Sequence, residues 1–205
     1  MKKSKKGERK AVYSSIETLD FEIPSWERIH WFSIEVAEEV KRSKFNPDII
    51  VGISRGGWVP ARIISDLLER AVLANVSVEF YEQLGETKGK PTITQPISIS
   101  VKEKKLLLVD DVADTGQSLA LVKKYLKDEG TLEIKIASVY YKPWSTVIPD
   151  YYRKETSLWI IFPWEVKESL RKIFEKFRGQ NITVDDIKQK LLQLGLDGKL
   201  IEKLN

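Results

Sequence analysis

The chain has 205 residues, of which 42% are hydrophobic and 31% charged, and its formal net charge is +4. This length suits one well-buried domain, and the composition is that of a globular protein rather than a disordered or membrane protein. Cysteine is absent and the only histidine is His30, which excludes disulfides and sites built from thiolates or several histidines. Any divalent ion must be held mainly by oxygen ligands, so magnesium is the expected metal.

The N-terminal segment, residues 1–10, contains six Lys or Arg but no apolar run follows it. It therefore lacks the pattern of a secretory signal, and we interpret it as a solvated tail. No stretch approaches the roughly 20 apolar residues that cross a bilayer. We expect a cytoplasmic protein without a membrane partner.

Strand and helix patterns alternate through the first half of the chain. The helical stretches place apolar residues every three or four positions, and the strands are short apolar or alternating runs. The predicted elements are a helix over 25–44, a strand over 48–51, a helix over 60–71 and a strand over 75–81.

The second half continues the alternation after a break. Residues 82–95 contain two Gly, Pro91 and several charges, a composition that predicts a mobile loop. The predicted elements that follow are strands over 97–101 and 105–109, a helix over 117–129 with Gly130 as its stop, and strands over 134–140 and 158–162.

This order of elements predicts an α/β fold with a largely parallel central sheet flanked by helices. Ligands bind such sheets beyond the carboxyl ends of the strands. Beyond the last strand, two apolar helical stripes with a plausible Thr183 cap predict a helical appendage. The chain is therefore divided into residues 1–24 as tail and lead-in, 25–165 as the main domain, and 166–205 as a C-terminal helical extension.

The strongest chemical pattern lies in residues 110–118, Asp-Asp-Val-Ala-Asp-Thr-Gly-Gln-Ser. Thr115, Gly116 and Ser118 fall between a strand end and a helix start, where unpaired N–H groups and partial positive charge converge. Gly116 permits close backbone approach, and the hydroxyls add donors. The segment therefore predicts a cradle for a monophosphate.

Two carboxylates, Asp110 and Asp111, precede this cradle, and the Gly-x-x-x-x-Gly-Lys-Ser/Thr pattern does not occur. Carboxylates beside a phosphate repel it unless they serve a sugar diol or a metal. A ribose 5-phosphate satisfies both conditions. The alternative is an acidic strand-to-helix turn in which Asp114 only caps the helix.

Residues 109–116 resemble the phosphoribosyl pyrophosphate motif of the type I phosphoribosyltransferases, and the resemblance extends over roughly residues 25–165. It implies the fold of that family, with a small hood. It also implies that Asp110 and Asp111 bind the ribose hydroxyls, directly or through magnesium, and that Asp114 assists deprotonation of a purine near N7. These three acids are the predicted catalytic groups. The predicted 5′-phosphate ligands are Asp114, Thr115, Gly116, Gln117 and Ser118.

A second anion site is predicted at Ser54-Arg55-Gly56-Gly57, which follows a strand and precedes a helix. Arg55 supplies a permanent forked charge suited to pyrophosphate. Although a Gly-Gly turn alone is a weak signal, this one resembles the pyrophosphate loop of xanthine-guanine phosphoribosyltransferases. That resemblance implies a loop in which a strained or cis peptide bond is frequent. Two cradles on one sheet edge suit a substrate with phosphates at both ends, and residues 82–95 are the expected lid.

The base is expected to be a 6-oxopurine. Lys142 matches the lysine that such family members place against O6 and N7, and an ammonium donor favours guanine, hypoxanthine or xanthine over adenine. The alternative is a solvated surface lysine.

Residues 157–165 resemble the hood of the bacterial xanthine-guanine enzyme. The resemblance implies that Trp159 stacks on the base and that Ile160 offers its backbone. Glu165 is a further candidate metal ligand. The alternative is that Trp159 and Trp164 are ordinary core aromatics.

The expected activity is magnesium-dependent transfer of a phosphoribosyl group from phosphoribosyl pyrophosphate to a purine base, giving a nucleoside monophosphate in purine salvage. The alternatives are transfer to orotate, uracil or adenine, and a non-catalytic sensor of phosphoribosyl pyrophosphate that regulates RNA or DNA. The only dense basic run is the short N-terminal one, so nucleic acid is not an expected partner. Relatives are usually dimers or tetramers, and a homodimer or homotetramer is expected.

Overall fold

The computed structural model describes residues 21–69, 71–81, 89–177 and 183–203. They form two compact units, Glu27–Ser157 in one and the described parts of Met1–Trp26 and Leu158–Asn205 in the other. Within these residues, every helix is too short or too polar to cross a membrane. The domain bounds proposed from the sequence remain a prediction.

The larger unit is built on a six-stranded sheet with the strand order β4-β3-β2-β5-β6-β7. All neighbouring strands run parallel except β3 and β4, which are antiparallel. The strands are β2 (Ile49–Ser54), β3 (Val72–Tyr81), β4 (Lys90–Gln95), β5 (Lys105–Ala113), β6 (Glu133–Tyr141) and β7 (Tyr151–Glu155).

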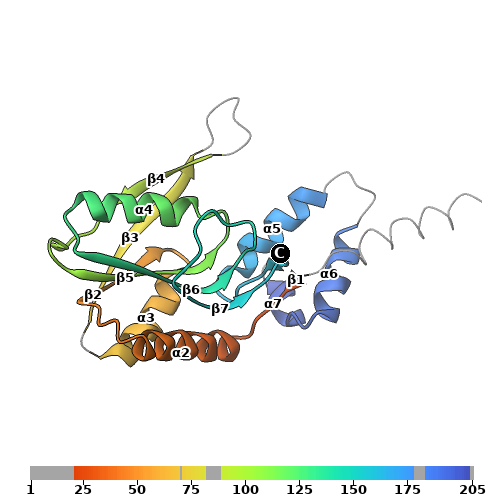
Figure 1. Cartoon of the computed structure of the whole chain (residues 1–205). Coiled ribbons are helices and arrows are strands. Elements are labelled where there is room, and N and C mark those ends of the chain that lie inside the picture. The colour runs from red at the N-terminus through yellow and green to blue at the C-terminus, as the bar shows by residue number, and fades with distance from the viewer. Residues whose placement is uncertain (1–20, 70, 82–88, 178–182, 204–205) are drawn as a thin grey trace, which may run out of the picture. The chain divides into compact units, whose positions relative to one another are not determined.

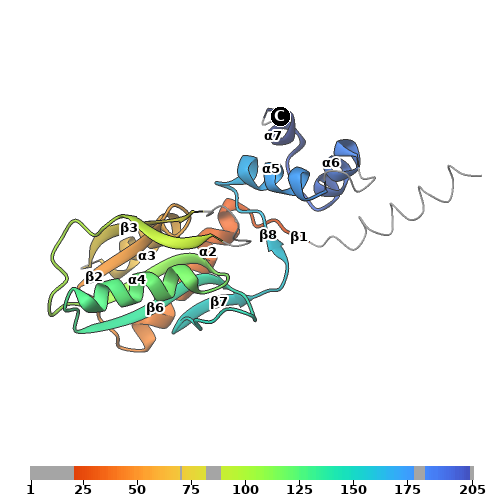
Figure 2. The same ribbon diagram turned by 90° about the horizontal axis from the view of Figure 1, so that it is seen from above.

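Helices cover both faces of this sheet, as its apolar strands predict. Helices α2 (Trp26–Arg42) and α3 (Trp58–Leu68) pack on one face, and α4 (Gln117–Asp128) packs on the other (Figures 1 and 2). Strand β5 shows the cause, because its residues alternate between two apolar clusters. Leu107 and Val109 join the cluster under α2 and α3, whereas Leu106 and Leu108 join the cluster under α4.

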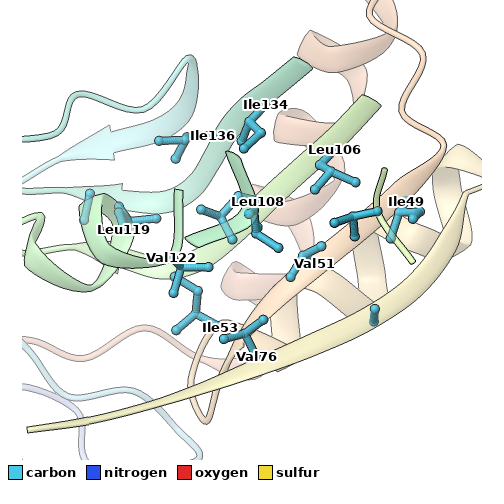
Figure 3. Close-up of a cluster of buried hydrophobic side chains, with 14 of the residues drawn as sticks. Ile49, Val51, Ile53, Val76, Leu106, Leu108, Leu119, Val122, Ile134 and Ile136 are labelled. Carbon is cyan, nitrogen blue, oxygen red and sulfur yellow. The ribbon is translucent and has the colours of Figure 1, made fainter. Parts of the chain in front are cut away.

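The cluster under α4 anchors the two strands that lead into the predicted anion loops (Figure 3). Ile53 of β2 and Leu108 of β5 are buried together with Leu119 and Val122 of α4. Each fully buried side chain of this size contributes roughly 1.5–3 kcal/mol. The carboxyl ends of β2 and β5 therefore start from a rigid base.

Strand β5 extends four residues beyond its predicted end at Val109. Its pairing with β2 stops at Val109, but its pairing with β6 continues through Asp110 and Val112 to Ala113. The ladder with β2 therefore ends before the acids, whereas the ladder with β6 includes Asp110 and resumes at Val112. The extension of β5 cannot be predicted from hydrophobicity, because backbone hydrogen bonds between strands form equally well at residues with polar side chains.

Predictions at the sheet edges were the least accurate. The strand predicted over 97–101 is wrong, because these residues pair with no strand. Residues 90–95, predicted as loop, form the edge strand β4, and edge strand β7 was missed. Both edge strands pair on one side only and lack a continuous apolar run. The remainder of the predicted mobile loop, residues 82–88, lies outside the described residues.

The smaller unit contains a two-stranded parallel sheet and the predicted C-terminal helices. Thr183 caps α6: its Oγ1 accepts a hydrogen bond from Asp186 N (3.1 Å), and the Asp186 carboxylate accepts one from Thr183 N (3.0 Å). This capping box fits the cap predicted from the sequence. The elements are β1 (Phe21–Glu22), β8 (Trp159–Ile160), α5 (Val166–Phe177), α6 (Val184–Gln193) and α7 (Gly198–Lys203).

Candidate active site

A cavity of about 390 Å³ lies at the carboxyl end of β5, within the size range of small-ligand sites. All of the predicted 5′-phosphate ligands line it, as does one of the two adjacent acids. The lining residues are Phe80, Gly89, Asp110, Val112, Asp114, Thr115, Gly116, Gln117, Ser118 and Leu119.

The start of α4 forms one wall of this cavity. Gly116 is the N-cap residue, with φ of +81°, a conformation that residues with a Cβ rarely adopt. A Cβ there would also lie 2.7 Å from Val147 N and 2.8 Å from Thr146 Oγ1. Both the backbone conformation and the close neighbours therefore require glycine at this position.

The two adjacent acids have different environments. Asp110 is half-buried and lines the cavity, whereas Asp111 is only 8% exposed. Each carboxylate accepts a hydrogen bond from the next backbone N–H, at 3.0 Å for Asp110 and 2.8 Å for Asp111. Burial, and then the charge of Asp111, raise the pKa of Asp110 well above its usual value. A cation or a hydrogen-bonding diol would relieve this repulsion.

The Ser-Arg-Gly-Gly loop, residues 54–57, comes directly against these acids. A Cβ on Gly56 would lie 1.9 Å from Asp111 Oδ2, and one on Gly57 would lie 2.8 Å from Asp110 Oδ1. The peptide bond between Ser54 and Arg55 is cis. The structure thus brings the two predicted anion loops together through main chain.

The loop after β6 forms another neighbour of the acidic segment, residues 110–118. Lys142 is only 5% exposed, and its N–H donates to the carbonyl of Ala113 (3.0 Å). Its ammonium lies 5.5 Å from the ring centroid of Trp144. The indole N–H of Trp144 in turn donates to Asp114 Oδ1 (3.0 Å). Lys142 is therefore a buried lysine held near the acidic segment rather than a solvated one.

A family model for the phosphoribosyl transferase domain matches residues 23–169. The chain belongs to the phosphoribosyltransferase family. It is 30% identical over 164 residues to the xanthine-guanine phosphoribosyltransferase of Cereibacter sphaeroides, covering 77% of this chain and 92% of that protein. The corresponding protein of Desulfotalea psychrophila is 31% identical over 145 residues, covering 70% of this chain and 85% of that protein.

Solved structures show the same fold. The crystal structure of a purine phosphoribosyltransferase from Pyrococcus horikoshii is 40% identical and gives a TM-score of 0.66, covering 71% of this chain and 94% of that chain. The match confirms the type I phosphoribosyltransferase fold, with its mostly parallel sheet flanked by helices.

The predicted hood residues of this phosphoribosyltransferase belong to the smaller unit. Trp159 is half-buried, and the Lys176 ammonium lies 5.3 Å from its ring centroid. Ile160 is buried, and the N–H of Glu165 donates to the carbonyl of Phe162 (3.1 Å). Their roles toward base and metal remain predictions.

Trp164 is half-buried and contacts two other aromatic rings. Its ring stacks on Phe162 at 4.7 Å and lies 5.6 Å from the ring of Trp26. Its indole nitrogen is buried without a hydrogen-bond partner. The choice between a core aromatic and a hood residue stays a prediction for Trp164.

Oxygen ligands for magnesium are available but few. In the part of the chain that the structure describes, no three His, Cys, Asp or Glu side chains gather as a metal cluster. Asp110 and Asp111 supply two adjacent carboxylates. Magnesium is commonly held by one or two carboxylates together with substrate phosphates and water. The pair therefore fits an ion that binds along with its substrate.

Two aromatic residues near the site were not identified from the sequence. Phe80 was placed on the alternating face of its strand, yet it is 52% exposed and lines the cavity. Trp144 is 53% exposed and bonded to Asp114. An aromatic two residues after Lys142 was an available signal for Trp144, whereas Phe80 had none.

Proposed function

We propose that this phosphoribosyltransferase transfers the 5-phosphoribosyl group of phosphoribosyl pyrophosphate to guanine, hypoxanthine or xanthine, releasing pyrophosphate and forming the nucleoside monophosphate of purine salvage. The observation that carries the proposal is one cavity lined by Asp110 and by residues 114–118, with the Ser-Arg-Gly-Gly loop against the acids. The names of the relatives support the class of base.

The two ends of the donor substrate would be held by different loops. The amides and hydroxyls of residues 115–118 at the start of α4 hold the 5′-phosphate. Arg55 and the amides beside Gly56 and Gly57 hold the departing pyrophosphate. The chemistry then depends mainly on positioning and on charge stabilisation.

The acids act on the sugar and on the base. Asp110 and Asp111 would hold the ribose hydroxyls and, with them, magnesium, which would supply charge stabilisation for the leaving pyrophosphate. Asp114 accepts the proton from the purine or steadies positive charge at the ribosyl carbon. The pKa of Asp110 is raised first by burial and second by the charge of Asp111, so a cation or diol at the pair would stabilise the ionised carboxylate.

The choice of base would depend on Lys142. Its ammonium donates to O6 of a 6-oxopurine but meets another donor in the 6-amino group of adenine. Trp159 would stack on the base, Ile160 would offer its backbone, and Glu165 would add a metal ligand. These three roles rest on the family resemblance.

The test is an assay of the full chain with phosphoribosyl pyrophosphate, magnesium and each base in turn, with the nucleotide product separated by chromatography. Product with guanine, hypoxanthine or xanthine, and none with adenine, orotate or uracil, is expected. Turnover of adenine, orotate or uracil would overturn the class of base. Binding of phosphoribosyl pyrophosphate without turnover, together with salt-sensitive RNA or DNA binding, would instead identify a regulator.

We also propose a homodimer or homotetramer in the cytoplasm. The family resemblance supports both the assembly and the location. Light scattering coupled to size-exclusion chromatography measures the mass directly, and a monomer would contradict the proposed assembly.

A further inference from the structure

Trp144 joins two residues that the proposed function places at the purine. Its indole N–H donates to Asp114 Oδ1 (3.0 Å), and the Lys142 ammonium lies 5.5 Å from its ring centroid. We propose that Trp144 is a positioning residue of the transfer reaction: its N–H orients the Asp114 carboxylate, and its ring orients the Lys142 ammonium. The inference rests on the proposed function, because it assumes that both side chains meet the base.

The backbone around Trp144 is tied to the acidic segment. The N–H of Ser145 donates to the carbonyl of Lys142 (2.9 Å), which closes a turn around Trp144. Thr146 donates to the carbonyl of Thr115 twice, from N at 3.1 Å and from Oγ1 at 2.9 Å. Although its side chain is 53% exposed, Trp144 therefore projects from a loop fixed to the residues that it would orient.

The chemistry of indole suits this role. The Asp114 side chain is exposed, and a carboxylate rotates readily about its last torsion unless a partner holds it. An indole N–H donates a hydrogen bond and accepts none. It can therefore hold Asp114 Oδ1 in place and leave Oδ2 for the purine. A cation beside an aromatic face is attracted by the ring, which restrains Lys142 without neutralising it.

Two variants separate the two contacts. Trp144→Phe keeps an aromatic face and removes the N–H, so kcat should fall roughly tenfold while the KM for guanine stays near the wild-type value. Trp144→Leu removes both contacts, so the KM for guanine should also rise several-fold. Trp31→Phe is the matched control, since Trp31 is 58% exposed on α2, and its kinetics should be unchanged. Wild-type kcat in Trp144→Phe would overturn the inference.

A double-mutant cycle distinguishes positioning from a general structural role. In an Asp114→Asn background, Trp144→Phe should cost little further kcat, because the carboxylate that it orients is already absent. A tenfold loss in both backgrounds would overturn the inference. Thermal melts of each variant exclude unfolding as the cause.

A measurement without turnover keeps this inference separable from the proposed function. In ¹⁵N-labelled protein, the indole resonance of Trp144 is identified by its loss in Trp144→Phe, and its exchange with water should accelerate in Asp114→Ala. Unchanged exchange in Asp114→Ala, with normal turnover by the wild type, would overturn the inference alone. Absence of wild-type turnover with every 6-oxopurine would overturn the proposed function, and with it the kinetic role of Trp144.

Discussion

The acidic segment, residues 110–118, presents side chains to the cavity, whereas the Ser-Arg-Gly-Gly loop, residues 54–57, reaches the same acids with main chain. Both span the carboxyl end of a strand and the approach to the next helix, and the two strands are parallel neighbours. Because of this difference, different substitutions should impair the two loops. In the acidic segment, activity should depend on the negative charge of each carboxylate. At the glycine positions, activity should depend on the absence of a Cβ atom.

The largest expected effect is loss of charge in the acidic segment. Asp114→Asn and Asp111→Asn should each lower kcat by about 10²–10⁴-fold, the usual contribution of acid–base and charge-stabilising groups. The fold should persist, because an amide oxygen can still accept the hydrogen bonds that these carboxylates accept. Steady-state kinetics and circular dichroism measure the two effects.

Asp128→Asn is the matched control for these substitutions, since Asp128 lies at the end of α4 and pairs with Lys124 at 2.8 Å on the exposed surface. Its kcat should equal that of the wild type. A near-normal rate in both Asp114→Asn and Asp111→Asn would refute the roles assigned to these acids.

The next largest effect is expected when a Cβ atom is added to the Ser-Arg-Gly-Gly loop. In Gly56→Ala, the new Cβ would lie 1.9 Å from Asp111 Oδ2, so the carboxylate or the loop must shift. A displacement of this size should lower kcat/KM for phosphoribosyl pyrophosphate by roughly 10- to 100-fold. Kinetics at several magnesium concentrations measure the change, and unaltered kinetics would show that main-chain contact with the acid is dispensable.

Two glycines allow the effect of backbone conformation to be measured separately from the effect of a steric clash. Gly116 and Gly130 both have positive φ, +81° and +85°, so alanine at either should cost about 1–2 kcal/mol of unfolding free energy. At Gly116 the Cβ also meets backbone at 2.7 Å, whereas at Gly130 the nearest atom is a Lys102 side-chain carbon at 3.3 Å. Only Gly116→Ala should therefore raise the KM for phosphoribosyl pyrophosphate.

Chemical denaturation and kinetics of both glycine variants measure these effects. Equal KM values in the two would mean that the N-cap of α4 does not contact the substrate.

The smallest effect concerns stability rather than rate. Because the pKa of Asp110 is raised in the folded chain, the unfolded chain loses this proton first as the pH rises above the usual aspartate value of about 4. The free energy of unfolding therefore decreases as the pH rises from that value to the raised pKa of the folded chain. Asp110→Asn should raise the melting temperature at pH 7 by a few degrees and should match the wild type at low pH.

Melting curves in EDTA, across the acid range, isolate this effect from metal binding. A lower melting temperature for Asp110→Asn at pH 7 would show that the two carboxylates are stabilised as anions by the protein alone.

Patterns local to the chain predicted most of this fold. The apolar run before Asp110 marked a strand buried on both faces, and helical spacing marked α2, α3 and α4. The edge strands β4 and β7 escaped prediction because pairing on one side requires no apolar run. The continuation of β5 through Asp110 escaped for a similar reason, since backbone pairing with β6 does not depend on side-chain hydrophobicity.

The sequence by itself determined the fold class, the family and the acidic segment, because periodic hydrophobicity and a glycine between a strand and a helix act within a few residues. Tertiary structure alone decided which distant groups meet. Gly56 abuts Asp111 because β2 and β5 are neighbours in the sheet, and Trp144 bonds Asp114 because the loop after β6 folds back over β5. Such contacts depend on strand order and register, and neither is encoded in any local pattern.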